Sequence, residues 1–159
     1  MAYVMFHQYF PEIAKRETRG IKISHNSDTN LPAGDYGFLE MFCDEPGCDC
    51  RRVLFSVVSD RTKDVLAVIT YGWENKQFYV DWLKDDDPAT IKELQGPALN
   101  TCSPQSRLAP ALLSFAQNVL LQDKDYIDRI KRHYRMFREK IDRSRKGLGG
   151  RQAVRDAVD

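Results

Sequence analysis

The sequence predicts an α+β fold, in which an antiparallel β-sheet of about four to five strands has two C-terminal helices packed on it. Apolar segments of strand length fill much of the first half of the chain, and short polar links separate most of them. Such links make neighbouring strands antiparallel, because a parallel pair needs a longer crossover. Apolar residues later recur at helical spacing, which predicts the two helices.

Several segments have the pattern of strands. A short strand is expected at residues 21–24, where apolar and polar residues alternate before a turn-forming stretch. Longer strands are expected at residues 36–43, 52–59, 64–72 and 77–83. The middle strands are apolar on both faces, so we expect one face to meet the core and the other to be at least partly covered.

Helices are expected before and after this sheet. A proline and a glutamate suit the first turn of a short helix over residues 11–17. Asp87, which precedes a proline, is expected to cap another helix by accepting backbone N–H bonds. Apolar spacing predicts an amphipathic helix over residues 106–121 and a second one from Asp125 to the glycines at 147–150.

Length and composition fit a single cytoplasmic domain. With 159 residues, of which 42% are hydrophobic, the chain can bury a substantial core. We expect one domain over residues 1–146 and a C-terminal tail over residues 147–159. No segment has the pattern of a signal peptide or a membrane helix, so we expect a cytoplasmic protein without a membrane partner.

Charge is unevenly distributed along the chain. Residues 1–123 hold 12 Lys and Arg against 17 Asp and Glu, whereas residues 124–151 hold 11 against 4. The basic C-terminal segment can dock on the acidic body or on an external anion such as nucleic acid. The candidate phosphate contacts are Arg132, Arg135, Arg138 and Lys140.

The segment FCDEPGCDCRR, residues 42–52, places three of the four cysteines within eight positions. Its Pro-Gly pair is expected to turn the chain, which brings Cys43 back toward Cys48 and Cys50. Three converging thiolates suit zinc, which takes four N or S ligands in a tetrahedron. We therefore predict a zinc site on these three cysteines.

Alternatives remain open for the thiols and for their charged neighbours. Arg51 and Arg52 are expected to balance the charge of a zinc cluster. Without a metal, the thiols would be inert apolar residues, or Cys43 and Cys48 would form a disulfide. In a thiol redox protein, the same arginines would instead lower the pKa of Cys50.

The fourth zinc ligand is open at this point. His133 and Cys102 rank first, because the C-terminal elements should pack on the sheet that carries the turn. The other candidates are His25, His7, Glu40, Asp44 and water.

Several stretches together resemble an uncharacterised bacterial family. They are Phe10-Pro11-Glu12, Glu17-Thr18-Arg19, LPAGDYGFLEMFCDEPGCDCRRV, Gly96-Pro97 with Leu99-Asn100, Gln105-Ser106 and Lys131-Arg132-His133-Tyr134. Proteins of this kind often resemble SEC-C relatives, whose further zinc-binding cysteine tail implies an adaptor role. The corresponding GLGGRQAVRDAVD of this chain holds no cysteine. The resemblance implies no established enzymatic activity.

No catalytic motif is found. The sequence contains no GxSxG, P-loop, HExxH or GxGxxG pattern. We therefore predict a binding or adaptor module for an unidentified protein partner rather than an enzyme. Nucleic-acid binding is the first alternative, and thiol redox chemistry is the second.

Overall fold

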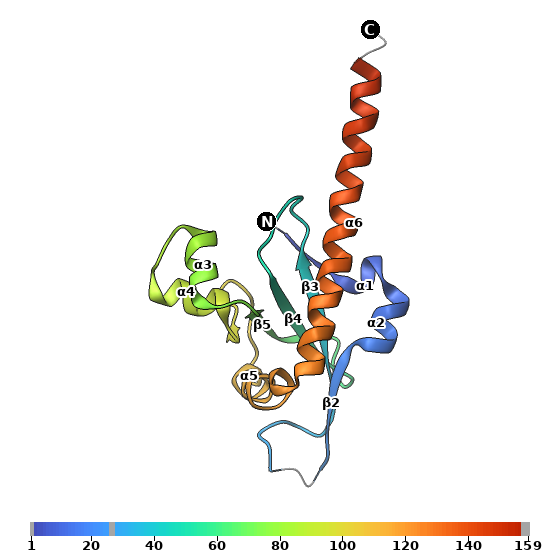
Figure 1. The fold of residues 1–159 in the computed structure, drawn as a ribbon. Coiled ribbons are helices and arrows are strands. Elements are labelled where there is room, and N and C mark those ends of the chain that lie inside the picture. Colours follow the sequence, from blue (N-terminus) through green and yellow to red (C-terminus); the bar gives the residue numbers. More distant parts are fainter. Residues whose placement is uncertain (1, 26–27, 157–159) are drawn as a thin grey trace.

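The computed structural model describes residues 2–25 and 28–156 (Figure 1). Within these residues, six strands form one antiparallel sheet in the order β1-β3-β4-β5-β6, and β2 also pairs with β3. The strands are β1 (Tyr3–Met5), β2 (Arg19–Ile23), β3 (Gly34–Cys43), β4 (Arg52–Ser59), β5 (Val65–Gly72) and β6 (Ala98–Leu99). The long strand β3 thus has room for two short partners along one side.

Helices surround this sheet. They are α1 (Phe6–Tyr9), α2 (Pro11–Glu17), α3 (Lys76–Leu83), α4 (Pro88–Gln95), α5 (Ala109–Asn118) and α6 (Lys124–Asp156), with a 3-10 turn η1 (Leu120–Gln122) before α6. Figure 1 shows α6 running alongside β3 and β4, with α1 and α2 at its other side. The predicted α+β class, with C-terminal helices packed on an antiparallel sheet, is confirmed.

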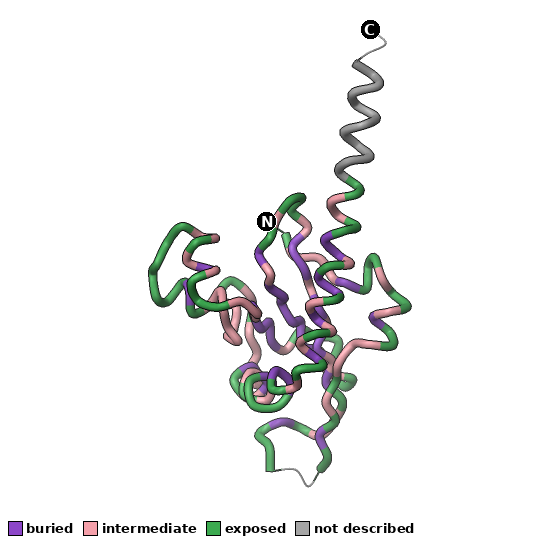
Figure 2. Tube along the Cα trace, in the orientation of Figure 1, coloured by how far each residue is buried: buried purple, intermediate pink, exposed green. Residues whose placement is uncertain are grey.

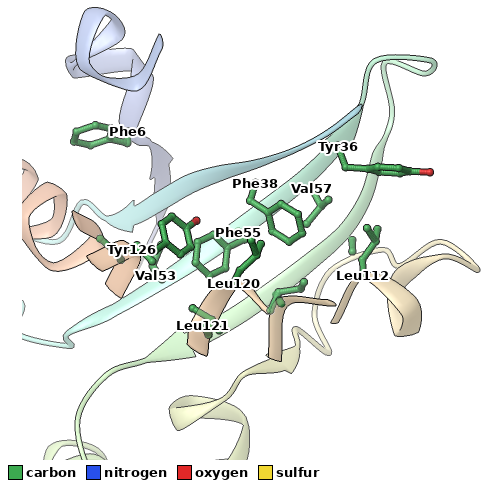
Figure 3. Close-up of a cluster of buried hydrophobic side chains, with 14 of the residues drawn as sticks. Phe6, Tyr36, Phe38, Val53, Phe55, Val57, Leu112, Leu120, Leu121 and Tyr126 are labelled. Carbon is green, nitrogen blue, oxygen red and sulfur yellow. The ribbon is translucent and has the colours of Figure 1, made fainter. Parts of the chain in front are cut away.

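The central strand β4 is buried on both of its faces (Figure 2). On one face Phe55 packs toward α6, with its ring centre 6.4 Å from that of Tyr126 and 6.2 Å from that of Phe38 (Figure 3). On the other face the Arg52 guanidinium donates to the Leu94 carbonyl of α4 over 2.9 Å. The expectation that both faces are covered is therefore confirmed.

Most of the predicted helices and strands agree in position with those of the structure. The bounds of α2 and β4 agree with the prediction, and β2, β3, β5 and α6 begin within two residues of it. Asp87 caps α4, because its carboxylate accepts the Thr90 N–H over 3.0 Å. The elements β1, α1 and β6 are missing from the prediction, since two to four residues cannot display a period.

Residues 77–83 were expected as a strand, and this expectation is wrong, because they form α3. The Asn75 side chain accepts the Phe78 N–H over 2.9 Å and so caps a helix there. Tyr79 and Leu83 lie four residues apart on one side of that helix, and Tyr79 is fully buried. The aromatic content of this segment favoured a strand, but the N-cap and the helical spacing decide.

The ends of the two C-terminal helices also differ from the prediction. α5 starts at Ala109 rather than at residue 106, because Pro110 fits only the first turn of a helix. α6 continues past the glycines at 147–150 to Asp156. Glycine weakens a helix by about 1 kcal/mol but keeps its backbone N–H, so it does not end the helix as proline would. The division between a domain over 1–146 and a tail stays a prediction.

A close contact at Gly72 in β5 provides a test of this packing. A Cβ atom at this position would lie 2.1 Å from the Tyr79 hydroxyl oxygen, and Tyr79 is fully buried. We expect Gly72→Ala to lower the free energy of unfolding by about 1–3 kcal/mol, because a buried ring must move. Denaturant unfolding measures this loss. Gly37→Ala is the control, since its Cβ atom would have ordinary 3.7 Å contact with Val58, and equal stability of both variants would contradict the packing described.

Candidate metal centre

The candidate site is the loop that joins β3 to β4, called here the cysteine loop (residues 44–51). The expected turn is present, because Gly47 has a φ of 74° and the Cys48 N–H donates to the Glu45 carbonyl over 3.2 Å. Positive φ is easily adopted by glycine, which has no Cβ atom. Arg51 also has a positive φ, 48°, directly before β4 begins.

Three cysteine sulfur atoms, one from the end of β3 and two from this loop, converge. The Sγ atoms of Cys43, Cys48 and Cys50 all lie within 4.8 Å of one another. Cys43 and Cys50 are fully buried and Cys48 is half-buried, and all three are free thiols. Cys43 and Cys48 are therefore not joined by a disulfide. The convergence that the Pro-Gly turn predicts is found.

The strands hold the first of these cysteines firmly in place. Cys43 is the last residue of β3 and pairs with Tyr3 of β1. The next residue, Asp44, donates its N–H to the Ala2 carbonyl over 2.9 Å. The Cys43 sulfur itself accepts the Glu45 N–H over 3.4 Å. The short strand β1, which sequence reasoning missed, thus helps to position a site residue.

Helix α6 holds the cysteine loop from outside with three side chains, four residues apart. Because four residues make about one turn, these side chains lie on one face of the helix. Each forms a hydrogen bond with the loop backbone: Tyr134 Oη accepts the Arg51 N–H (3.1 Å), Arg138 Nη2 donates to the Glu45 carbonyl (3.0 Å), and an Asp142 oxygen accepts the Gly47 N–H (2.9 Å).

Two buried arginines lie close to the sulfur atoms. Arg52 is 7% exposed and donates to the Leu94 carbonyl and to the Tyr3 hydroxyl, both over 2.9 Å. Arg138 is 8% exposed, and its Nε and Nη1 atoms are buried without a hydrogen-bond partner. Among the described residues, neither arginine forms an ion pair with a carboxylate. In the described part of the chain, two buried positive charges are therefore not paired with a carboxylate.

Arg51 does not have the predicted orientation. Its guanidinium forms ion pairs with Asp49 over 2.9 Å and with Glu74 over 3.2 Å, and it lies 4.6 Å from the centre of the Phe78 ring. These partners satisfy its charge away from the thiols. The residues suited to balance a charged sulfur cluster are thus Arg52 and Arg138 rather than Arg51 and Arg52.

Burial raises the pKa of all three thiols. Negative charge on a neighbouring cysteine raises it further, at Cys43 from Cys48, at Cys48 from Cys50 and at Cys50 from Cys43. Arg52 lowers the pKa of Cys50 and Arg138 lowers that of Cys43, but burial is the larger effect. The lowered pKa that a redox role requires at Cys50 is therefore contradicted.

His133, a leading candidate for the fourth ligand, lies in a separate buried network. Its Nδ1 atom is 2.8 Å from Glu40 Oε1 and its Nε2 atom is 3.3 Å from Glu17 Oε2. The fully buried ring stacks on Phe6 with the ring centres 4.4 Å apart. Both ring nitrogens of His133 contact carboxylates, and neither His133 nor Glu40 belongs to the group of converging donor atoms at the cysteines. Sequence reasoning missed this network, whose members lie far apart in the chain.

The other candidate ligands also lie outside the cluster. Cys102, His7 and His25 are exposed, and Cys102 lies in a turn after β6. Asp44 is beside Cys43 in the chain but does not belong to the group of converging donors. The described residues include every cysteine and histidine of the chain. Among them, no fourth donor joins the group formed by Cys43, Cys48 and Cys50.

The four cations proposed for nucleic-acid binding have different surroundings. Arg132 forms an ion pair with Glu17, and Arg138 is buried against the cysteine loop. Arg135 is exposed, and so is Lys140, whose Nζ atom lies 5.7 Å from the centre of the Tyr9 ring. Three of the four residues therefore make contacts within the protein, and Arg138 is the one that is buried.

Comparisons with known proteins identify no relative of this chain. The chain matches no protein-family model, no curated protein and no solved structure. The resemblance to the bacterial SEC-C-associated family stays a prediction. Among the described residues, no helix combines the length and the apolar character needed to span a membrane.

The pKa directions predict how the metal-free protein reacts with a thiol reagent. We expect exposed Cys102 to react first, and Cys43, Cys48 and Cys50 to react slowly at neutral pH, because burial keeps their thiols protonated. Reaction rates with a chromogenic disulfide, measured against pH, test this. Cys102→Ser is the control and should lack the fast phase. A fast phase that persists in this variant and maps to Cys50 would revive the redox alternative.

Proposed function

We propose that this protein is a zinc-binding module whose metal organises the cysteine loop, and that it acts as a binding or adaptor protein rather than as an enzyme. The observation that carries this proposal is the convergence of three sulfur atoms within 4.8 Å. Tetrahedral zinc with Zn–S bonds of about 2.3 Å would place its sulfur ligands about 3.8 Å apart. The cluster thus needs movements of only about 1 Å to hold the ion.

The charges around the cluster support a bound cation with thiolate ligands. Burial opposes thiolate formation in the metal-free protein, but a divalent cation displaces the thiol protons. Zinc with three thiolates has a net charge of −1, which the buried charges of Arg52 and Arg138 would stabilise. The Nε and Nη1 atoms of Arg138 have no hydrogen-bond partner among the described residues, and the charge of this side chain lowers the pKa of Cys43, so it would favour a thiolate there.

A metal at this position would join elements that are distant in the chain. Its ligands come from β3 and from the cysteine loop, and the loop is bonded in turn to β1 and to α6. Zinc would therefore fix the relative positions of a sheet and a long helix, as a structural metal does. A reducing, cytoplasmic setting would keep the thiols available, and membership of the bacterial family named above would agree with this role.

The two alternative functions have less support. Of the four cations proposed for nucleic-acid binding, Arg138 is buried and Arg132 forms an ion pair with Glu17. A redox function would need a thiol with a lowered pKa, whereas burial raises the pKa of Cys43, Cys48 and Cys50. The structural metal site accounts for both the buried thiols and the buried cations.

Metal analysis of purified variants tests the proposal. We expect the wild-type protein to carry about one zinc per chain, and Cys48→Ser/Cys50→Ser to carry none, because one thiolate cannot retain the ion. Chelation should lower the free energy of unfolding of the wild type by about 4 kcal/mol if free zinc is a thousandfold above its Kd. Native mass spectrometry and thermal unfolding measure the two effects.

The matched control for this experiment is Cys102→Ser. Cys102 is free and exposed and lies outside the sulfur cluster, so the variant should still carry about one zinc per chain. Wild-type protein that stays metal-free in zinc-replete medium, and that unfolds identically with and without chelator, would contradict the proposed function.

A further inference from the structure

The cysteine cluster has one ligand fewer than a closed zinc site. Structural zinc sites have four protein ligands, whereas a site with three keeps a position for an incoming group. Among the described residues, which contain all the cysteines and histidines, the converging donors are Cys43, Cys48 and Cys50 alone. We propose that a thiolate from outside this chain, a cysteine of another polypeptide, completes the metal shell. This inference rests on the proposed zinc-binding function.

One side of the cluster is accessible from the protein surface. Cys43 and Cys50 are 0% exposed and close the inner side. Cys48 is only half-buried, and residues 45–47 before it are exposed (Figure 2). A Cβ atom added to Gly47 would meet no other atom within 4 Å, so the turn is open in that direction, while Asp142 of α6 accepts the Gly47 N–H from another direction. A ligand from another molecule can therefore approach beside Cys48.

The buried charges favour an anionic fourth ligand over a neutral one. Arg52 and Arg138 together contribute two positive charges that lack carboxylate partners among the described residues. Zinc with three thiolates has a net charge of −1 and leaves one of these charges uncompensated. A fourth thiolate brings the cluster to −2, which balances both arginines. A neutral imidazole or water would leave a buried positive charge, which is costly in a protein interior.

Ligand exchange at this position needs no oxidant or reductant. The incoming thiol releases its proton to the buffer, its sulfur forms a bond to the metal, and the solvent molecule bound there leaves. The sulfur donor can come from a partner protein or from Cys102 of a second copy of this chain, which is exposed and free. Both sources offer the same chemistry, so the experiment must separate them.

Cobalt-loaded protein provides a direct spectroscopic test. Cobalt(II) occupies zinc sites, and its visible and charge-transfer bands report the number of thiolate ligands. We expect titration of cobalt-loaded Cys102→Ser protein with 2-mercaptoethanol to add charge-transfer absorption that saturates at a single thiol per cobalt. A cysteine-containing peptide should produce the same change, and imidazole at equal concentration should not.

Variants of α6 test the role of buried charge. We expect Arg138→Met to weaken thiol binding about tenfold, because the charge that attracts the thiolate is lost. Arg135→Met removes an exposed cation from the same helix and should leave thiol binding unchanged. If Arg138→Met does not fold, the titration of Cys102→Ser protein still decides the question.

The outcomes separate this inference from the function on which it rests. Failure of cobalt to bind at the three cysteines contradicts the metal-binding proposal itself. Cobalt that binds to Cys102→Ser protein but whose spectrum does not respond to added thiol contradicts the external ligand and leaves the metal-binding proposal standing. Four sulfur ligands and a dimeric mass in the wild type, both lost in Cys102→Ser, would support the proposal and identify a second copy as the source.

Discussion

The docking of α6 against the cysteine loop is the constraint on which the candidate site depends. Three hydrogen bonds, from Tyr134, Arg138 and Asp142, reach backbone groups that lie between and beside the cysteines. Because these bonds fix the backbone of the loop, they also fix the directions of its side chains. The convergence of the sulfur atoms is thus a tertiary property, which the turn alone does not determine.

A second set of polar contacts holds α6 on a different side. His133, the residue before Tyr134, lies between the carboxylates of Glu17 in the α2 helix and Glu40 in β3. One turn later Phe137 packs on Phe42, with the ring centres 5.6 Å apart. Hydrogen bonds inside a protein specify one arrangement because an unpaired buried group is costly. The histidine that resembled a metal ligand in the sequence therefore positions the helix instead.

The sequence was sufficient to predict the fold class and the meeting of the three cysteines, because local patterns indicate both, although the contacts with α6 that fix the loop are not visible in them. Apolar strand segments, short links and the Pro-Gly turn within residues 42–52 can all be recognised without tertiary information. The role of Arg138 could not be recognised, since a basic residue on a helix looks the same whether its face is solvated or buried. Likewise, the pairing of His133 with Glu17 and Glu40 joins residues about a hundred positions apart, and no local signal reports such a distance. Asn75 before α3 was a usable signal, which the aromatic residues after it obscured.

The most direct test of the account is the X-ray absorption spectrum at the zinc edge of purified Cys102→Ser protein without added thiol. The account predicts a first shell of three sulfur atoms at about 2.3 Å, with a light atom from solvent and without the outer-shell pattern of an imidazole. A first shell of nitrogen and oxygen alone would place the ion elsewhere and contradict the account. Replacement of Cys48 by serine should remove sulfur from that shell, which ties the spectrum to the loop.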